Sequence, residues 1–332
     1  MMKKALSIIL LLALLVVFFA CSPAERTAYG FSMGSDYKVS YDFNGDLDKE
    51  IADLFASVES SYSVRVDSSV LSRLNAAKAG EMITLTSEEN EVLYQAFALA
   101  SATRSAFDPA ILPLVKLWGF DPPYEMNGEV PPADIAILKA TILSEMNQFT
   151  LYHDLSIITK RSDDAALDLG AAIKGYAVGR ALDLLREKGA TKGLVWLGGT
   201  VGALGDSYPI GVTAPRESNQ DYAFRFTLSD GEICATSGDY ERYYEYEGKR
   251  YHHILDVNTG YPASSDVISA TIVAKDGLIA DAFATAVVVL GVEKGVALLE
   301  EYGLKGALVT KEKKVVTVGL TVTIKDTTYE IV

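Results

Sequence analysis

The chain has 332 residues, 49% of them apolar and 22% charged, and its 44 acidic against 30 basic side chains give a formal net charge of −14. This length suits two domains of about 150 residues or one larger domain, and the composition excludes a disordered or fibrous chain. The acidic balance leaves no basic stripe to neutralise a phosphate backbone, so nucleic acid is not expected as a partner. An anionic substrate would need a local positive charge at its site, such as a metal ion.

The first twenty residues differ from the rest of the chain. Two lysines precede an uncharged apolar run over residues 5–20, which is shorter than the roughly 20 residues of a spanning helix and has the flanks of a signal peptide. Residues 18–21 resemble a bacterial lipobox, with Cys21 as the lipidated residue. A plain membrane anchor is the alternative. In both cases we expect the chain after residue 20 on the periplasmic side of the inner membrane.

The next segments predict a strand and two helices. Alternation predicts a strand over Tyr37–Tyr41, and apolar residues at helical spacing predict a helix over Leu47–Val58. Thr86, followed three residues later by Glu89, has the pattern of a capping box. The helix that it begins should run toward Ser105.

Prolines and glycines mark the middle of the chain. We expect Pro109 and Pro113 to end the preceding helix, and the Pro- and Gly-rich stretch 121–132 to be a surface loop between two lobes. Beyond it, helices are predicted over 173–187 and 280–290, strands over 193–197 and 267–274, and a meander of short strands over 307–310, 315–318 and 321–324. Because strands and helices do not alternate strictly, the predicted fold class is α+β.

Four polar clusters in the second half could carry chemistry, since common nucleotide-binding and hydrolase motifs are missing from the sequence. In the first cluster, Asp168 precedes a small-residue turn that opens a helix, and Lys174 lies in the first turn of that helix. Lys174 and the free amides of the helix start could bind a phosphate. The alternative is an aspartate N-cap with a solvated lysine.

The second cluster is the glycine run 198–202, which follows an apolar strand. It could line a cofactor, or it could be a tight turn that needs positive φ.

The third cluster holds two of the three histidines, between a hydroxyl-bearing turn at 236–240 and Asp256. One histidine could be a general base that a carboxylate orients. A pair of surface histidines on a strand is the alternative.

The fourth cluster is Asp281 with Thr285, which are four residues apart and therefore share a helix face. Two hard oxygen ligands suit Mg²⁺, which takes its remaining ligands from water and substrate phosphates. The alternative is an aspartate favoured by the helix dipole and a threonine bonded to a backbone carbonyl.

In this order the clusters resemble the bacterial ApbE family, the FAD:protein FMN transferases. The resemblance covers nearly all of the chain after the signal segment. It rests on residues 32–35, 71–75, 107–109, 113–115, 117–120, 168–170 with 174–177, 198–199, 236–240, 253–256 with 259–262, and 280–282 with 284–285. It implies a T-fold-like α+β architecture that holds one FAD between two lobes, with Mg²⁺ at the pyrophosphate.

The resemblance also implies roles for individual residues. The magnesium ligands would be Asp281, Thr285 and the backbone carbonyl of Ala171. Residues near the flavin nucleotide would be Met33, Tyr62, Asp108, Lys174, Gly198, Gly199, Thr236, Ser237 and Gly238, with Tyr62 stacked against the isoalloxazine. We expect His253 to be the base, and the spacing alone suggests that Asp256 orients it. Where many members have Gly-Gly-Asp, Thr200 follows Gly199 here.

The implied reaction transfers FMN from FAD to a threonine of a partner protein and releases AMP. The expected acceptors are flavin-bearing subunits of membrane ion-pumping redox complexes. Two alternatives use the same residues. If water replaces the threonine, the enzyme is an FAD pyrophosphatase, and if no reaction occurs the protein is a flavin-binding or storage lipoprotein.

Overall fold

The computed structural model describes residues 25–120, 130–216 and 222–332. Its centre is a nine-stranded sheet in the order β1-β2-β6-β7-β10-β15-β16-β17-β19, antiparallel except for the β17–β19 pair. The strands are β1 (Arg26–Ser32), β2 (Ser35–Tyr41), β6 (Gly193–Leu197), β7 (Thr200–Leu204), β10 (Ile233–Gly238), β15 (Val267–Ala274), β16 (Lys305–Thr310), β17 (Lys314–Val318) and β19 (Glu330–Ile331).

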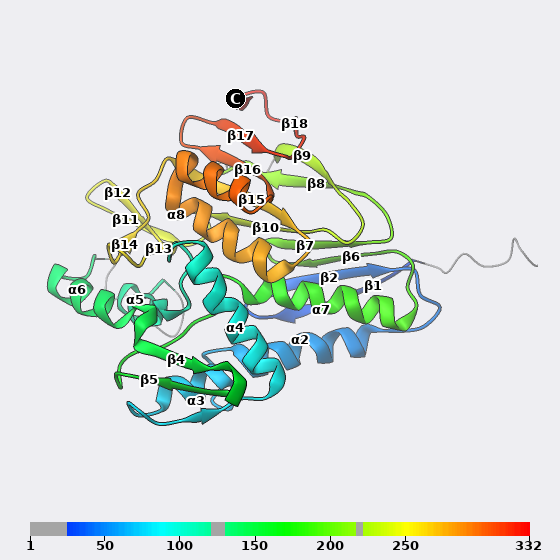
Figure 1. Cartoon of the computed structure of the whole chain (residues 1–332). Helices are drawn as coiled ribbons and strands as arrows, with labels where there is room; N and C mark the ends of the chain where they lie inside the picture. The colour runs from blue at the N-terminus through cyan, green and yellow to red at the C-terminus, as the bar shows by residue number, and fades with distance from the viewer. Residues whose placement is uncertain (1–24, 121–129, 217–221) are drawn as a thin grey trace, which may run out of the picture.

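Helices cover one face of this sheet (Figure 1). They are α2 (Asp48–Tyr62), α7 (Ile173–Lys188) and α8 (Gly277–Glu301), with α4 (Ser87–Ala102) packed outside them. Helix α7 packs on β6 and β7, and α8 packs on β10 and β15. The main hydrophobic core lies between, and its members include Val39, Phe55, Leu182 and Phe283, each no more than 1% exposed. This burial is what holds α7 beside α8.

A three-stranded sheet covers part of the opposite face. It consists of β8 (Tyr208–Thr213), β9 (Tyr222–Leu228) and β18 (Thr323–Ile324) in the order β18-β9-β8. A second hydrophobic core joins it to β7, β10, β15, β16 and β17, through residues such as Phe224, Cys234 and Val309. No residue of β1, β2 or β6 belongs to this second core in the described chain.

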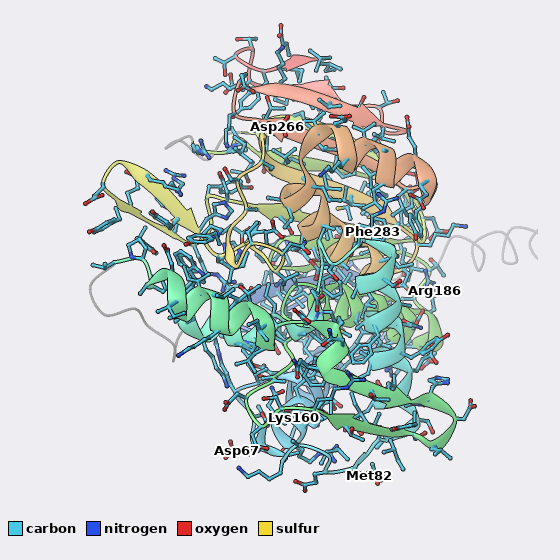
Figure 2. The ribbon with its side chains drawn as sticks, turned by 60° about the vertical axis from the view of Figure 1, so that its left-hand side comes forward. Asp67, Met82, Lys160, Arg186, Asp266 and Phe283 are labelled. Atoms are coloured by element: carbon cyan, nitrogen blue, oxygen red, sulfur yellow. The ribbon has the colours of Figure 1, made fainter. Side chains whose placement is uncertain are left out.

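The remaining elements lie at one end of the helical layer. A small sheet in the order β3-β5-β4 carries Lys160, which Figure 2 shows at the opposite end of the molecule from Asp266. A third core surrounds Trp118. The elements are α3 (Val70–Ala76), β3 (Ile83–Thr84), η1 (Pro109–Ile111), α5 (Leu112–Trp118), α6 (Asp134–Leu143), η2 (Met146–Gln148), β4 (Phe149–Tyr152), η3 (His153–Leu155), β5 (Ile157–Lys160), β11 (Tyr243–Tyr246), β12 (Lys249–His252), β13 (Leu255–Asp256) and β14 (Tyr261–Pro262).

The α+β fold class and most periodic segments are confirmed. Strands β6 and β15 have the predicted bounds, and β2, β16, β17, α7 and α8 contain the segments predicted for them, while α2 begins one residue later than predicted, with Leu47 as its N-cap. The capping box of α4 is present: the Thr86 side chain accepts from the Glu89 amide, and the Glu89 carboxylate accepts from the Thr86 amide. Most of the predicted inter-lobe loop, residues 121–129, lies outside the described residues, as does Cys21.

Three details of the prediction are wrong. Helix α4 ends at Ala102, because Arg104 and Ser105 have left-handed backbone conformations. Pro109 and Pro113 begin η1 and α5, since a proline in the first helical turn loses no hydrogen bond. The C-terminal strands do not form a three-stranded meander, because β18 pairs with β9 while β17 pairs with β19.

Helix α8 is long and apolar enough to cross a membrane by length and composition. It is a core helix here, because more than half of its most apolar stretch is buried inside the fold. Gly291 interrupts its helical geometry with a φ of 79°, a conformation that glycine adopts at no steric cost.

Candidate active site

Two adjoining cavities lie at the start of α7; the first also reaches the start of α8 and the end of β10, and the second also reaches the end of α2. The first encloses about 160 Å³ and the second about 420 Å³, and their walls share Asp168, Gly170, Lys174 and Arg242. The first cavity is lined by the predicted site residues Asp108, Ala171, Lys174, Gly199, Thr236, Ser237, His253, Asp281 and Thr285. The second is lined by Met33, Tyr62 and Lys174. The fold therefore gathers predicted site residues from eight separate segments of the chain around two adjoining cavities.

Asp281 lies in the first turns of α8 and is 5% exposed. Its Oδ2 accepts the backbone amide of Gly175 at 3.0 Å. A side chain on Gly175 would clash with the carbonyl oxygen of Gly277, 1.8 Å from its Cβ, so the close approach of α7 and α8 requires glycine there. Burial raises the pKa of Asp281, and the positive charge of Lys174 opposes that shift.

Hydroxyl groups line the wall beside Asp281. The Oγ of Ser237 and the Oγ1 of Thr285 are 3.1 Å apart, and Thr236 pairs its hydroxyl with that of Thr271 at 2.9 Å. The Thr236 amide donates to the carbonyl of Gly199 at 3.0 Å. A Cβ on Gly199 would lie 2.8 Å from the Thr236 oxygen, so glycine permits this contact between the β6–β7 turn and β10.

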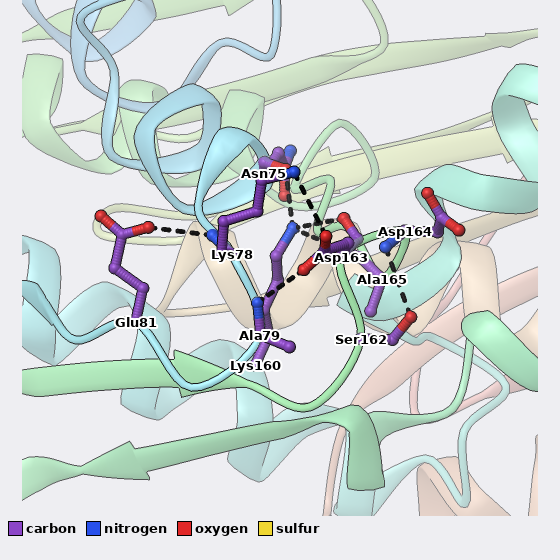
Figure 3. A network of polar contacts seen from close by, with 9 residues as sticks. All are labelled: Asn75, Lys78, Ala79, Glu81, Lys160, Ser162, Asp163, Asp164 and Ala165. Carbon is purple, nitrogen blue, oxygen red and sulfur yellow. Dashed lines mark hydrogen bonds and ion pairs between the residues drawn. The ribbon is translucent and has the colours of Figure 1, made fainter.

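A buried lysine fixes the segment that precedes α7. Figure 3 shows the Lys160 Nζ donating to the backbone carbonyls of Asn75, Asp163 and Ala165, at 2.7, 2.9 and 3.0 Å. The Asn75 side chain in turn holds both the amide and the carbonyl of Leu167, at 2.7 and 2.9 Å. These bonds orient the residues that lead into Asp168, Gly170 and Ala171 in the cavity wall.

His253 lies at the wall of the first cavity with its Nδ1 3.3 Å from the carbonyl oxygen of Arg242. A carbonyl only accepts, so Nδ1 carries the proton in the neutral ring and Nε2 keeps a lone pair. Burial lowers the pKa of His253 to about 3, with the charge of Arg242 as the next cause. The imidazole is therefore neutral at physiological pH and can accept a proton.

The orienting role predicted for Asp256 does not match its contacts. Its Oδ1 accepts the Asn258 amide at 2.9 Å and the Asn258 side chain at 3.1 Å, which forms an Asx turn. The Asp256 carboxylate thus bonds within its own turn, and the His253 ring contacts the Arg242 carbonyl. The adjacent His252 lines neither of the two cavities, and its Nε2 lies 2.9 Å from the carbonyl of Ala263.

Two predicted glycines lie outside the cavity walls. Gly198 is in the β6–β7 turn with a φ of 56°, and a Cβ there would meet the Ser35 hydroxyl at 2.9 Å, so its position agrees with the turn alternative. Gly238 ends β10, and a Cβ there would lie 2.3 Å from the ring of Tyr240. Both positions shape the backbone that carries the neighbouring site residues.

The wall of the second cavity is built from the β1–β2 turn and α2. Met33 has a φ of 50°, and Glu59 holds it there by accepting the Met33 amide at 3.0 Å and the Ser32 hydroxyl at 2.7 Å. Tyr62 lies one helical turn further along α2 and packs edge-on against Tyr176, with ring centroids 5.9 Å apart. Its hydroxyl is buried without a hydrogen-bond partner among the residues that the structure describes, and burial raises its pKa.

Charged residues missed by the sequence reasoning complete the walls. Arg242 lines both cavities, and Glu241 lines the first. Burial raises the pKa of Glu241, while Lys174 and Arg242 oppose the rise. The predicted residue Asp108 is 5% exposed, and burial raises its pKa to about 6. A single charged residue carries no spacing pattern, so Arg242, Glu241 and Glu59 offered no sequence signal.

The predicted metal ligands fit a hard cation that is only partly held by protein. In the described part of the chain, no group of three His, Cys, Asp or Glu side chains gathers to hold a metal. The first cavity instead offers one carboxylate from Asp281, one hydroxyl from Thr285 and the backbone of Ala171. Oxygen ligands in small number suit Mg²⁺, which keeps several waters or takes phosphate oxygens.

Several known proteins are similar to this chain in sequence. The sequence model of the ApbE family matches residues 33–308. A FAD:protein FMN transferase of Klebsiella pneumoniae (strain 342) is 33% identical over 88% of this chain and 92% of its own length. One of Treponema pallidum (strain Nichols) is 34% identical over 80% and 78%.

Solved structures show the same fold. The flavin transferase ApbE from Vibrio cholerae superposes with a TM-score of 0.77 at 27% identity, covering 92% of this chain and 98% of that one. The ApbE protein of Thermotoga maritima gives a TM-score of 0.78 at 28% identity, covering 92% and 98%.

Proposed function

This chain belongs to the ApbE family, and on that premise we propose that it transfers FMN from FAD to a threonine of an acceptor protein and releases AMP. One observation supports the proposal above the others. A neutral histidine, a lysine and a buried carboxylate, namely His253, Lys174 and Asp281, line a single cavity that adjoins the aromatic wall at Tyr62. A base and phosphate-binding groups thus lie beside a surface suited to a flat ring.

FAD spans the two cavities in this proposal. The isoalloxazine lies in the second cavity against Tyr62, where ring stacking would hold it. The pyrophosphate lies in the first cavity near Lys174, which lines both cavities and whose positive charge acts on Asp281. The negative charge of the pyrophosphate would also raise the pKa of His253, because an anion favours the imidazolium.

His253 acts as the general base. Its Nε2 takes the proton of the acceptor hydroxyl, while Nδ1 keeps its own proton and donates it to the Arg242 carbonyl. The hydroxyl oxygen forms a bond to the FMN phosphorus, the pyrophosphate P–O bond breaks, and AMP leaves with that bridging oxygen. The product is a phosphate ester of FMN and the acceptor side chain, and no redox change occurs.

Asp281, Thr285 and the carbonyl of Ala171 would hold Mg²⁺ beside the pyrophosphate. When bound, the ion neutralises phosphate charge and stabilises the leaving group. Asp281 is suited to this because its Oδ2 accepts the Gly175 amide, so that bond would hold the carboxylate in place while Oδ1 could bind a cation. The raised pKa of Asp281 falls once a cation is near.

We propose further that Cys21 is lipidated and that the protein acts on the periplasmic side of the inner membrane. The apolar run before Cys21 and the lipobox-like residues 18–21 support this. Acceptors anchored in the same membrane, such as flavin-bearing subunits of ion-pumping redox complexes, would then reach the enzyme by diffusion in the plane of the membrane.

Incubation with FAD and Mg²⁺, with and without a domain that bears a candidate acceptor threonine, tests the proposal. Covalent FMN on that threonine, matched by AMP, is the expected result. AMP and free FMN at the same rate without acceptor would indicate an FAD pyrophosphatase. Intact FAD that stays bound to the protein would indicate a flavin carrier.

A further inference from the structure

Three exposed side chains form one row across the uncovered end of the nine-stranded sheet. In the strand register Tyr29 of β1 is opposite Lys38 of β2, and Lys38 is opposite Trp196 of β6. Tyr29 is 68% exposed and Trp196 is 38% exposed, and the Lys38 Nζ lies over the Tyr29 ring at 5.8 Å. We call Tyr29, Lys38 and Trp196 the aromatic face.

The aromatic face has no partner within the described fold. Neighbouring residues on the same strands, such as Ala28, Val39 and Val195, are at most 1% exposed and point into the main core. Successive side chains alternate between sheet faces, so the aromatic face points to the side opposite the helices. The β18-β9-β8 sheet covers that side only from β7 onward.

The position of this face in the chain identifies its occupant. Arg26, where β1 begins, is five positions after Cys21, and five residue-to-residue steps span at most about 18 Å. A lipid anchor at Cys21 would therefore keep β1 close to the headgroup layer. Tyrosine and tryptophan with a nearby lysine are the side chains enriched at membrane interfaces, where an amphipathic ring meets both water and lipid.

We propose that the aromatic face rests on the phospholipid headgroup layer of the membrane to which Cys21 is anchored. This inference depends on the proposed lipid anchor and goes beyond the proposed transfer reaction. It also sets an orientation. Phe31, on the same strand as Tyr29, is 69% exposed and lines the second cavity, so that cavity opens beside the membrane surface.

Tryptophan fluorescence of the full chain tests the orientation. The chain has two tryptophans; Trp196 is partly exposed and Trp118 is fully buried, so a W196F variant reports Trp118 alone. The full chain is purified from membranes, reconstituted into phosphatidylcholine vesicles with lipids brominated near the headgroup, and compared with the same protein in unbrominated vesicles. We expect brominated lipids to quench an emission component that W196F lacks, and Tyr29→Ser to reduce that quenching.

Several results would overturn the inference. One is that iodide quenches the Trp196 emission while brominated lipid does not. Another is that the chain is absent from membranes. A third is that Trp196 becomes protected from iodide only when an acceptor protein is added. FMN transfer to a soluble acceptor is measured on the same samples. Since Trp196 lines neither cavity, W196F should retain transfer, and a failure of transfer with normal quenching would count against the proposed function alone.

Discussion

The backbone amide of Gly175 donates to the Oδ2 of Asp281 at 3.0 Å. This bond joins the first turn of α7 to the first turns of α8, which are 106 residues apart in the sequence. It forms where Gly175 and Gly277 bring the two helix backbones together. The geometry of the proposed catalytic carboxylate therefore depends on a glycine contact between helices.

Replacing Gly175 by alanine should destabilise the protein by at least about 2 kcal/mol, because the new Cβ would meet the Gly277 carbonyl at 1.8 Å and the helices would have to move apart. Gly179→Ala in the same helix is the control. Its Cβ would make an ordinary 3.6 Å contact with Ile233 and should stabilise by about 0.5–1 kcal/mol. Thermal unfolding of the two variants measures the difference, and equal melting temperatures would contradict the contact.

Asp281→Ala should reduce FMN transfer by roughly 10²-fold or more, since it removes the only carboxylate among the proposed metal ligands. The fold should persist, because the substitution removes a buried carboxylate whose ionised form is disfavoured by burial. Asp276→Asn is the matched control. Asp276 caps the same helix by accepting the amides of Leu278 and Ile279, and it lines neither cavity. Transfer by D281A at the wild-type rate would refute the metal assignment.

His253→Ala should reduce the transfer rate by about 10²–10⁴-fold, the usual contribution of a general base, while FAD affinity changes little. His252→Gln is the control, because glutamine can still donate to the Ala263 carbonyl that His252 contacts at 2.9 Å. Since the pKa of His253 in the free enzyme is about 3, kcat/KM should show no acid limb from this group between pH 5 and 8. Equal losses in the two variants would argue against His253 as the base.

Asp108→Asn should stabilise the protein at neutral pH and not at low pH. Burial raises the pKa of Asp108 from 3.8 to about 6. Between pH 3.8 and 6, the carboxyl is therefore protonated in the folded state and ionised in the unfolded state. The stability contributed by this group is thus present below pH 3.8 and lost as pH rises through 6, at a cost of about 3 kcal/mol. Denaturant unfolding at pH 4 and 7.5 measures the gap, and a gain independent of pH would contradict the raised pKa.

Local signals predicted the elements whose structure is decided locally. The Thr86–Glu89 capping box and the all-buried strand Val267–Ala274 are examples. Pairing between distant segments left no such signal. Strand β18 pairs with β9, about 100 residues earlier in sequence, and β1 carries outward aromatic residues at Tyr29 and Phe31 in place of the polar residues that mark an outer face.

The residue types of the site were predictable, and their contacts were only partly so. Lys174, His253 and Asp281 do line one cavity, as the ordered motifs suggested. The spacing of His253 and Asp256 suggested a pair, but an Asx turn takes up the Asp256 carboxylate and the Arg242 carbonyl holds the ring. Backbone carbonyls such as this one have no sequence signature.

The ratio of AMP released to FMN attached in a single turnover tests the central claim most directly. The wild-type chain, its FAD and Mg²⁺ are mixed with excess acceptor domain, and both products are quantified from the same sample by mass spectrometry. We expect one covalent FMN on the acceptor threonine for each AMP, and neither product from H253A on that time scale. AMP accompanied by free FMN, with no adduct on the acceptor, would contradict it.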